Sequence, residues 1–323
     1  MRSQTPQGRA SGIKSSSKSI IMRVVVFGAS GVQGAAQLPV LSRAGHDVVA
    51  VSRNPKPLEI DGRKIETAAA DFNDKAAISQ ALKGAEVIFL NLPSTSFHPS
   101  EPIIAAAQAI GEAAKASGVR LIVFNTSMPV AEVSQRIKSQ EDRREMRRVL
   151  RESGVPVISI QPVCYLDNLL EGWALPPIRD RNTLVYCHKP SLRACWICHH
   201  DVAQLMLAAA ARPDLAGRDI PVGGPEVVRL QELAEKLSKA WSRKLDYENQ
   251  TVADFCEKIS KTMQGRGLEV DRIISQMFKA YTYYNESPDH PFVIDMGPVL
   301  KELPVKLTPI EEWARTHPVP GWT

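Results

Sequence analysis

Three glycines in one turn give the strongest chemical signal in this sequence. The segment Gly28–Gly34 begins and ends with glycine, has a third glycine midway, follows the apolar run Ile20–Phe27 and opens a helical pattern. Such a turn reverses tightly, lets backbone N–H groups approach a pyrophosphate, and lets the helix pack close to the sheet. The alternative is an ordinary strand-to-helix turn. The residues expected to bind the phosphates are Gly28, Ser30, Gly31, Val32 and Gly34.

An arginine stands where the second apolar run, Val48–Val51, comes to an end. An NAD-dependent protein places Asp or Glu there to accept a hydrogen bond from the ribose 2′-OH. Arg53 cannot accept that bond, but it can donate to a 2′-phosphate and stack on the adenine. The sequence therefore favours NADP(H), with Lys56 as additional charge. The alternative is a solvated surface arginine.

The segment Cys195–His200 resembles a metal or haem motif, because it contains Cys-x-x-Cys-His. Haem attachment requires export, and no apolar signal segment precedes the first strand. A zinc site would need a second ligand pair, which the sequence lacks. We expect a strand over Arg193–Cys198, on which Cys195 and Cys198 face opposite sides. A metal or redox site is the alternative, and we predict none.

A charged helix is expected within Arg136–Glu152, where acids lie three or four residues from bases. Pairs such as Glu141 with Arg144 and Glu145 with Arg148 favour a solvated, salt-bridged face over a helix that reads DNA.

These residues must be positioned by alternating strands and helices. Apolar β-branched runs alternate with helical patterns over about 140 residues, which predicts parallel βαβ units in a doubly wound, Rossmann-type sheet. The expected strands are Ile20–Phe27, Val48–Val51, Lys64–Ala70, Val87–Leu92, Leu121–Phe124 and Val157–Ile160. The expected helices between them are Val32–Ala44, Asp74–Leu82, Pro102–Ser117 and Glu141–Ser153.

After Pro162 this alternation stops, and we expect a smaller, mixed, mostly helical substrate lobe. Asp201 is expected to cap a helix over Asp201–Ala211. The predicted organisation is a disordered basic tail (residues 1–19), a dinucleotide-binding domain (20–162, with later returns of the chain) and a substrate lobe (163–323).

Short stretches spread over most of the chain carry a family resemblance: Val24–Gly34, Val51–Pro55, Ala70–Phe72, Val87–Pro93, Asn125–Ser127, Gly154–Asn168, Asp201–Ala203, Gly223–Glu226 and Pro309–Trp313. In these stretches the chain resembles the NmrA-like family of atypical short-chain dehydrogenase/reductases. The resemblance implies a Rossmann-type fold and NADP(H). It also implies that Asp71 and Phe72 contact the adenine edge, and that Asn91, Leu92 and Pro93 line the nicotinamide ribose.

The resemblance points to proton donors as well, although the usual tyrosine–lysine pair is absent. None of the six tyrosines has a lysine four residues later. In the isoflavone-reductase-like branch a lysine in the helix after the fifth strand serves instead. Arg143 occupies that place, with Lys138 as the acid if the register shifts. Arg143 is a poor proton donor but can stabilise an oxyanion or hold a phosphate.

Two hydroxyls follow strands at the edge of the sheet where ligands bind. Tyr165 is the first candidate proton donor, and Ser127 is a candidate to hold the substrate carbonyl. The alternatives are a packed core tyrosine and a turn-forming serine.

Composition agrees with this reading. The chain has 323 residues, 44% of them hydrophobic and 23% charged, and a net charge of +5, of which Arg2, Arg9, Lys14 and Lys18 supply four. The rest is nearly neutral, so we expect no nucleic-acid partner. No apolar run could span a membrane, and five cysteines favour the reducing cytoplasm.

We therefore expect an NADP(H)-dependent oxidoreductase acting on a small apolar carbonyl, enone or quinone. The alternative is a catalytically silent NADP(H)-binding redox sensor that acts through a protein partner. The missing tyrosine–lysine pair favours the alternative.

Overall fold

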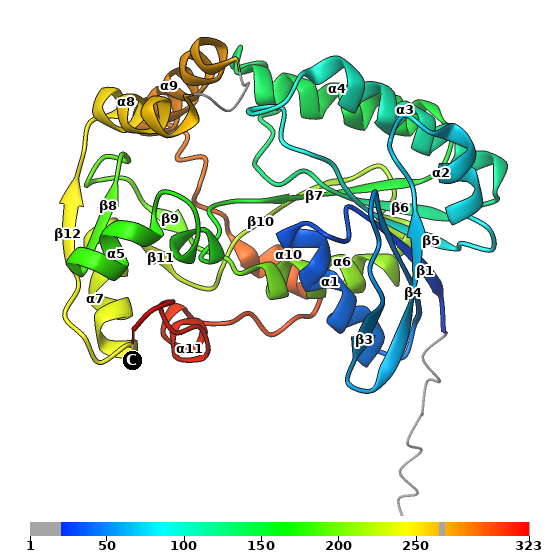
Figure 1. Ribbon diagram of the computed structural model, residues 1–323, viewed down its shortest axis with the longest axis horizontal. Coiled ribbons are helices and arrows are strands. Elements are labelled where there is room, and N and C mark those ends of the chain that lie inside the picture. The colour runs from blue at the N-terminus through cyan, green and yellow to red at the C-terminus, as the bar shows by residue number, and fades with distance from the viewer. Residues whose placement is uncertain (1–20, 265–268, 323) are drawn as a thin grey trace, which may run out of the picture.

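The computed structural model describes residues 21–264 and 269–322 (Figure 1). The tail predicted over residues 1–19 lies outside this range. An eight-stranded sheet has the order β10-β7-β6-β5-β1-β2-β4-β3, and β3 alone runs antiparallel to its neighbour. The strands are β1 (Arg23–Phe27), β2 (Asp47–Ser52), β3 (Leu58–Ile60), β4 (Arg63–Ala69), β5 (Val87–Asn91), β6 (Leu121–Asn125), β7 (Val157–Pro162) and β10 (Asp219–Val222).

Helices cover both faces of the sheet, as the alternating pattern predicts (Figure 1). Because successive side chains of a strand point to opposite faces, Val24 and Val26 pack with α1 and α6, whereas Val25 and Phe27 pack with α2, α3 and α4. The doubly wound α/β fold is therefore confirmed. The helices are α1 (Val32–Arg43), α2 (Lys75–Ala81), α3 (Ser100–Ala116), α4 (Lys138–Glu152) and α6 (His199–Ala210).

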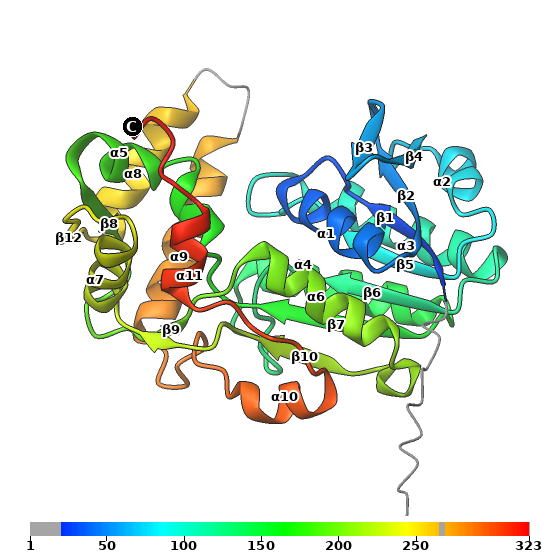
Figure 2. The same cartoon turned by 90° about the horizontal axis from the view of Figure 1, so that it is seen from below.

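The second half of the chain forms a mixed, mostly helical lobe at one end of the sheet (Figure 2). Its strands pair in twos, β8 with β12 and β9 with β11. The short strands are β8 (Thr183–Tyr186), β9 (Ala194–Cys195), β11 (Val227–Val228) and β12 (Asp246–Asn249). The helices are α5 (Leu175–Arg181), α7 (Leu230–Ala240), α8 (Val252–Met263), α9 (Val270–Glu286), α10 (Met296–Glu302) and α11 (Ile310–Thr316), with 3-10 turns η1 (Asp167–Leu170) and η2 (Pro213–Leu215).

Of two local predictions around α6, one is confirmed only in part and the other is wrong. The strand expected over Arg193–Cys198 is limited to β9, and Cys198 is already the N-cap residue of α6. Asp201 does not cap this helix. Its carboxylate instead accepts hydrogen bonds from the backbone N and the Oγ1 of Thr308, at 2.6 and 2.8 Å. Asp201 thus binds the distant segment around Thr308, a contact that residue spacing does not indicate.

The sheet also recruits a strand from beyond the predicted domain boundary. β10 pairs in parallel with β7, and α6 packs beside α1. The domain boundary at Pro162 stays a prediction. β10 and α6 are the parts of the later chain that return to the first domain. Within the described residues, no helix is both long enough and apolar enough to cross a bilayer.

Candidate functional site

A cavity of about 670 Å³ opens along the carboxyl ends of the parallel strands. Its walls include all the residues expected to bind the cofactor except Lys56: Gly28, Ser30, Gly31, Val32, Gly34, Arg53, Asp71, Phe72, Asn91, Leu92 and Pro93. Tyr165, Ser127 and Arg143 line the same cavity. The fourth catalytic candidate, Lys138, does not. Its side chain is 41% exposed and pairs with Asp142 at 3.0 Å.

The glycine turn has the geometry that its sequence suggests. Gly28 has φ +73°, and a Cβ there would lie 2.6 Å from the Asn91 carbonyl oxygen. A Cβ on Gly34 would lie 2.2 Å from the Gly28 carbonyl oxygen, so this glycine is needed for close packing of α1. A Cβ on Gly31 would have only the Gly28 oxygen nearby, at 3.4 Å, and Gly31 lines the cavity. Of these three glycines, Gly31 is therefore the one with the most open space around its Cβ position.

The start of α1 is prepared for an anion. Gly31 is the N-cap residue, and within the described chain no side chain caps this end and no acid lies in the first turn. The first N–H groups of a helix have no partner inside the helix, and the helix dipole adds positive potential there. This end of α1 can therefore hold a phosphate group without displacing a side chain.

Amide side chains beneath the turn form a buried network that sequence reasoning missed. Asn91 exchanges hydrogen bonds with Gln37 at 2.8 and 2.9 Å and donates to the Phe27 carbonyl at 3.0 Å. Asn125 donates to Asn91 at 3.2 Å and to Gln33 at 2.7 Å. The sequence contained one indication of this network. The fully buried apolar strands β5 and β6 each end in a polar residue. The network fixes the strand ends relative to α1.

Ser127 is held in a left-handed conformation with φ +62°. Its backbone N donates to Asn125 Oδ1 at 2.9 Å, and its hydroxyl donates to Gln33 Oε1 at 2.8 Å. Such a conformation is unfavourable for a residue with a side chain, and neighbouring contacts must maintain it.

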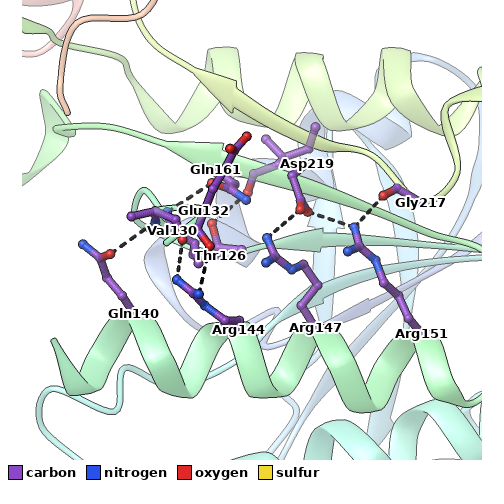
Figure 3. Close-up of polar contacts among 12 residues, drawn as sticks. Thr126, Val130, Glu132, Gln140, Arg144, Arg147, Arg151, Gln161, Gly217 and Asp219 are labelled. Atoms are coloured by element: carbon purple, nitrogen blue, oxygen red, sulfur yellow. Dashed lines mark hydrogen bonds and ion pairs between the residues drawn. The ribbon is translucent and has the colours of Figure 1, made fainter. Parts of the chain in front are cut away.

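Side chains from α4 and β7 maintain the loop that follows Ser127 (Figure 3). Gln161 accepts from the Val130 N at 3.1 Å, and Gln140 accepts from the Ala131 N at 3.2 Å. Arg144 donates to the carbonyls of Ala131 and Glu132. The loop is therefore anchored on both sides, which keeps Ser127 at the cavity.

Tyr165 is 4% exposed and packs edge-on against His199, with the ring centroids 4.4 Å apart. Its hydroxyl has no hydrogen-bond partner in the part of the chain that the structure describes. Burial raises the pKa of Tyr165 well above its usual value, while nearby Asn125 and the charge of Arg143 act in the opposite direction. This hydroxyl stays protonated at neutral pH and is free to donate to a ligand.

Arg143 is buried next to the same space. Its Nε donates to the Thr126 carbonyl, and its Nη1 donates to the Ser139 carbonyl at 3.1 Å. Burial lowers the pKa of Arg143 to about 10, opposed by Tyr284, Asp142 and Tyr165. The guanidinium is therefore still charged at neutral pH. The structure brings Arg143, Tyr165 and Ser127 to one end of the cavity and leaves Lys138 outside.

No cluster of potential metal ligands is present in the described residues, which include Cys195–His200. The salt bridges expected on α4 are present. Arg148 lies 2.6 Å from Glu145, and Arg144 lies 3.8 Å from Glu141.

Known proteins with similar sequences are reductases by name. A (4-alkanoyl-5-oxo-2,5-dihydrofuran-3-yl)methyl phosphate reductase of Streptomyces griseus is 31% identical over 225 residues, covering 70% of this chain and 76% of that protein. An NAD(P)H azoreductase of Xenophilus azovorans is 26% identical, covering 91% and 97%.

Solved structures agree on the fold. The NADPH-dependent quinone oxidoreductase of Escherichia coli in complex with NADPH aligns with a TM-score of 0.69 at 19% identity, covering 91% of this chain and 99% of that one. NmrA, a negative transcriptional regulator, in complex with NAD aligns with a TM-score of 0.70 at 18% identity, covering 92% and 95%. The sequence model of the NmrA-like family matches residues 21–314. The chain belongs to the NmrA-like family.

Proposed function

We propose that this chain binds NADP(H) in the cavity and reduces a small, largely apolar carbonyl, enone or quinone. One observation carries the proposal: a single cavity joins a phosphate-binding helix start to an unpartnered, buried Tyr165 hydroxyl and the Arg143 guanidinium. A nucleotide-binding protein without chemistry needs the first feature only. The names of the relatives, which include azo, furanone phosphate and quinone reductases, support reduction as the reaction class.

The residues of the cavity fit this cofactor. The backbone around Gly31 would hold the pyrophosphate, since a Cβ there would enter the open space. Arg53, exposed at the end of β2, would pair with the 2′-phosphate. Asp71 and Phe72 would lie at the adenine, and Asn91–Pro93 at the nicotinamide ribose. When bound, the reduced nicotinamide supplies a hydride.

The chain itself supplies the proton and the electrostatics. Tyr165 donates its hydroxyl proton to the carbonyl oxygen of the acceptor as the carbonyl carbon gains the hydride, so the product is the alcohol. Arg143 stabilises the negative charge that develops on that oxygen. Ser127 would orient the carbonyl by turning its hydroxyl from Gln33 Oε1 to the acceptor. The tyrosine–lysine pair is replaced by tyrosine and arginine from different elements.

NADPH oxidation against a panel of quinones and aldehydes, together with direct titration of NADP⁺, tests the proposal. We expect saturable cofactor binding and turnover with at least one acceptor class. Binding without turnover across the panel would favour the sensor, and absence of binding would refute both.

A further inference from the structure

A buried guanidinium with unused donors borders the inner end of the cavity. Arg143 is 3% exposed and lines the cavity together with Ser127 and Tyr165. Its Nε and Nη1 donate to backbone carbonyls, but Nη2 donates to no atom in residues 21–264 and 269–322. A guanidinium carries five N–H donors. Part of this one is therefore available to a group inside the cavity.

The charge of Arg143 is also without a carboxylate in an ion pair among the described residues. The adjacent Asp142 directs its carboxylate to Lys138 Nζ at 3.0 Å and Ser100 Oγ at 2.7 Å. The other arginines of α4 all pair with acids. A buried charge that lacks a counterion is strongly destabilising. A ligand that brings negative charge to this point would remove that cost.

The rest of the cavity wall in this region is largely apolar, with Ser94, His98 and Asn168 as its polar members. Its apolar members include Leu92, Pro93, Phe97 and Met128. Of the described residues that line the cavity, Asp71 is the only acid, and it follows β4, four strands away from β6 in the sheet. The carboxylate of Asp142 is close to Arg143, but it does not line the cavity and its charge is paired with Lys138.

We propose that Arg143 selects an acceptor that carries an oxyanion, either a carboxylate or a phosphate ester, on an otherwise apolar body. The inference rests on the proposed reductase function and names its substrate class. A guanidinium can donate two parallel hydrogen bonds to a carboxylate or a phosphate. Such a pair fixes the orientation of the anion in addition to attracting its charge. This role differs from stabilising charge that develops during reduction, because the substrate anion is present before the reaction starts.

Matched aldehydes test the inference. The acceptors are 4-carboxybenzaldehyde, 4-formylphenyl phosphate and neutral 4-methylbenzaldehyde, with wild type, Arg143→Gln and Arg143→Lys. The measured quantity is kcat/KM for each anionic aldehyde divided by kcat/KM for the neutral one. Comparing this ratio between variants cancels the intrinsic reactivity of each aldehyde. We expect Arg143→Gln to lower it by about 10- to 100-fold and Arg143→Lys to retain part of it. The aldehyde whose ratio falls further in Arg143→Gln identifies the preferred anion.

Arg148→Gln is the matched control. Arg148 lies on the same helix and is 52% exposed, and its loss changes the net charge equally. Among the residues that the structure describes, its ion-pair partners are two surface acids, Glu145 and Glu152. The ratio should change by less than about 2-fold, since exposed ion pairs are weak. The NADPH affinity and thermal stability of each variant verify that the fold and the cofactor end are intact.

A measurement without turnover separates this inference from the proposed function. Benzoate and benzamide are titrated by calorimetry into wild type saturated with NADP⁺. We expect benzoate to bind at least about 10-fold more tightly, with the difference lost in Arg143→Gln. Equal binding, or an equal loss of rate for charged and neutral aldehydes in Arg143→Gln, would overturn the inference. If no aldehyde or quinone oxidises NADPH, the proposed function fails, and this titration still decides the anion site. If Arg143→Gln does not fold, Arg143→Lys and the wild-type titration decide it.

Discussion

The two ends of the cavity differ in which parts of the chain form them, backbone atoms at one end and side chains at the other. The outer end is lined by residues of the turn Gly28–Gly34, whose backbone we propose as the phosphate site, and by one charged side chain that could bind the cofactor, Arg53. At the inner end, side chains do the work: Ser127 follows β6, Arg143 projects from α4, and Tyr165 follows β7. The first site is contiguous in sequence and depends on the shape of one turn. The second exists only once three elements have packed, so the two ends should respond differently to substitution.

The largest effect is expected from valine at Gly31. Its backbone, with φ −81° and ψ 159°, is open to any residue, so the fold should tolerate the change. The added side chain would occupy the space where the phosphates approach. We expect NADPH affinity to fall by more than about 100-fold, measured by titration, with unchanged far-UV circular dichroism.

Gly34→Val is the companion variant. Its Cβ would lie 2.2 Å from the Gly28 carbonyl oxygen, so this change should lower thermal stability as well as binding. Normal NADPH binding by Gly31→Val would remove the main physical support for the dinucleotide site.

Tyr165→Phe should separate chemistry from stability. Because the Tyr165 hydroxyl has no partner in the described residues, its removal should not destabilise the fold. Loss of the proton donor should lower kcat by about 100- to 10,000-fold at unchanged NADPH affinity. Tyr284→Phe is the control. It removes a hydroxyl that accepts from Gln140 at 3.2 Å, so it should cost stability and little rate. Equal rates for both variants would exclude Tyr165 as the acid.

Acid should weaken the second lobe while the glycine turn is unaffected. Burial lowers the pKa of His188 from 6.5 to about 4, against a hydrogen bond to Asn285. Neutral His188 is compatible with burial, so it stabilises the folded state at pH values above 6.5, the pKa of histidine in the unfolded chain. That contribution is lost as the pH falls from about 6.5 towards 4. The loss is about 3 kcal/mol of unfolding free energy.

Urea unfolding at several pH values checks this prediction. His188→Gln should be less stable at pH 7.5 but should show a flatter decline towards acid. The exposed His200→Gln should follow wild type. Parallel curves for wild type and His188→Gln would show that His188 is not the titrating group.

Arg53→Ala tests the one side chain on which the outer end depends. It should reduce the preference for NADPH over NADH by about 10- to 100-fold, the value of a charge-assisted contact. Titration of both cofactors measures the change, and kcat at saturating NADPH should remain. A preserved preference would place the 2′-phosphate elsewhere.

The smallest effect is expected at Cys198. As the N-cap residue of α6 it makes no side-chain cap, and serine is a preferred N-cap residue, so Cys198→Ser should change stability by less than about 1 kcal/mol. Cofactor affinity should remain, and metal analysis should find no stoichiometric zinc. About one equivalent of zinc would restore the metal interpretation of Cys195–His200.

The sequence predicts the central fold well, because its strands are long apolar runs and its helices end at glycines. It misses β3 and β10, which are short edge strands. β10 also contains Pro221, which lacks an N–H and suits an edge. Such edge strands form only beside neighbours that other segments of the chain supply, so their local sequence pattern does not predict them.

For the site, too, features with a local sequence pattern are predicted and features that depend on distant segments are missed. The cofactor residues expected from the sequence, Lys56 excepted, line the cavity, because they lie at or shortly after strand ends. Lys138 lies outside it because α4 starts three residues earlier than expected, which makes Lys138 the first helical residue and leaves it half exposed. The amide network of Gln33, Gln37, Asn91 and Asn125 joins α1, β5 and β6, and pairing of this kind cannot be derived from residue spacing.

The position of β10 bears on how the molecule forms. This strand completes the sheet beside β7, although the whole segment 163–218 separates them in the chain. While the chain is being made, β7 keeps an unpaired outer edge until that excursion has folded and returned, and unpaired edges invite aggregation. Arg147 and Arg151 then fix the returning strand through Asp219, at 2.7 and 2.9 Å. A fragment that ends at Pro162 is therefore not expected to act as an autonomous nucleotide-binding module, because the excursion is part of its folding unit.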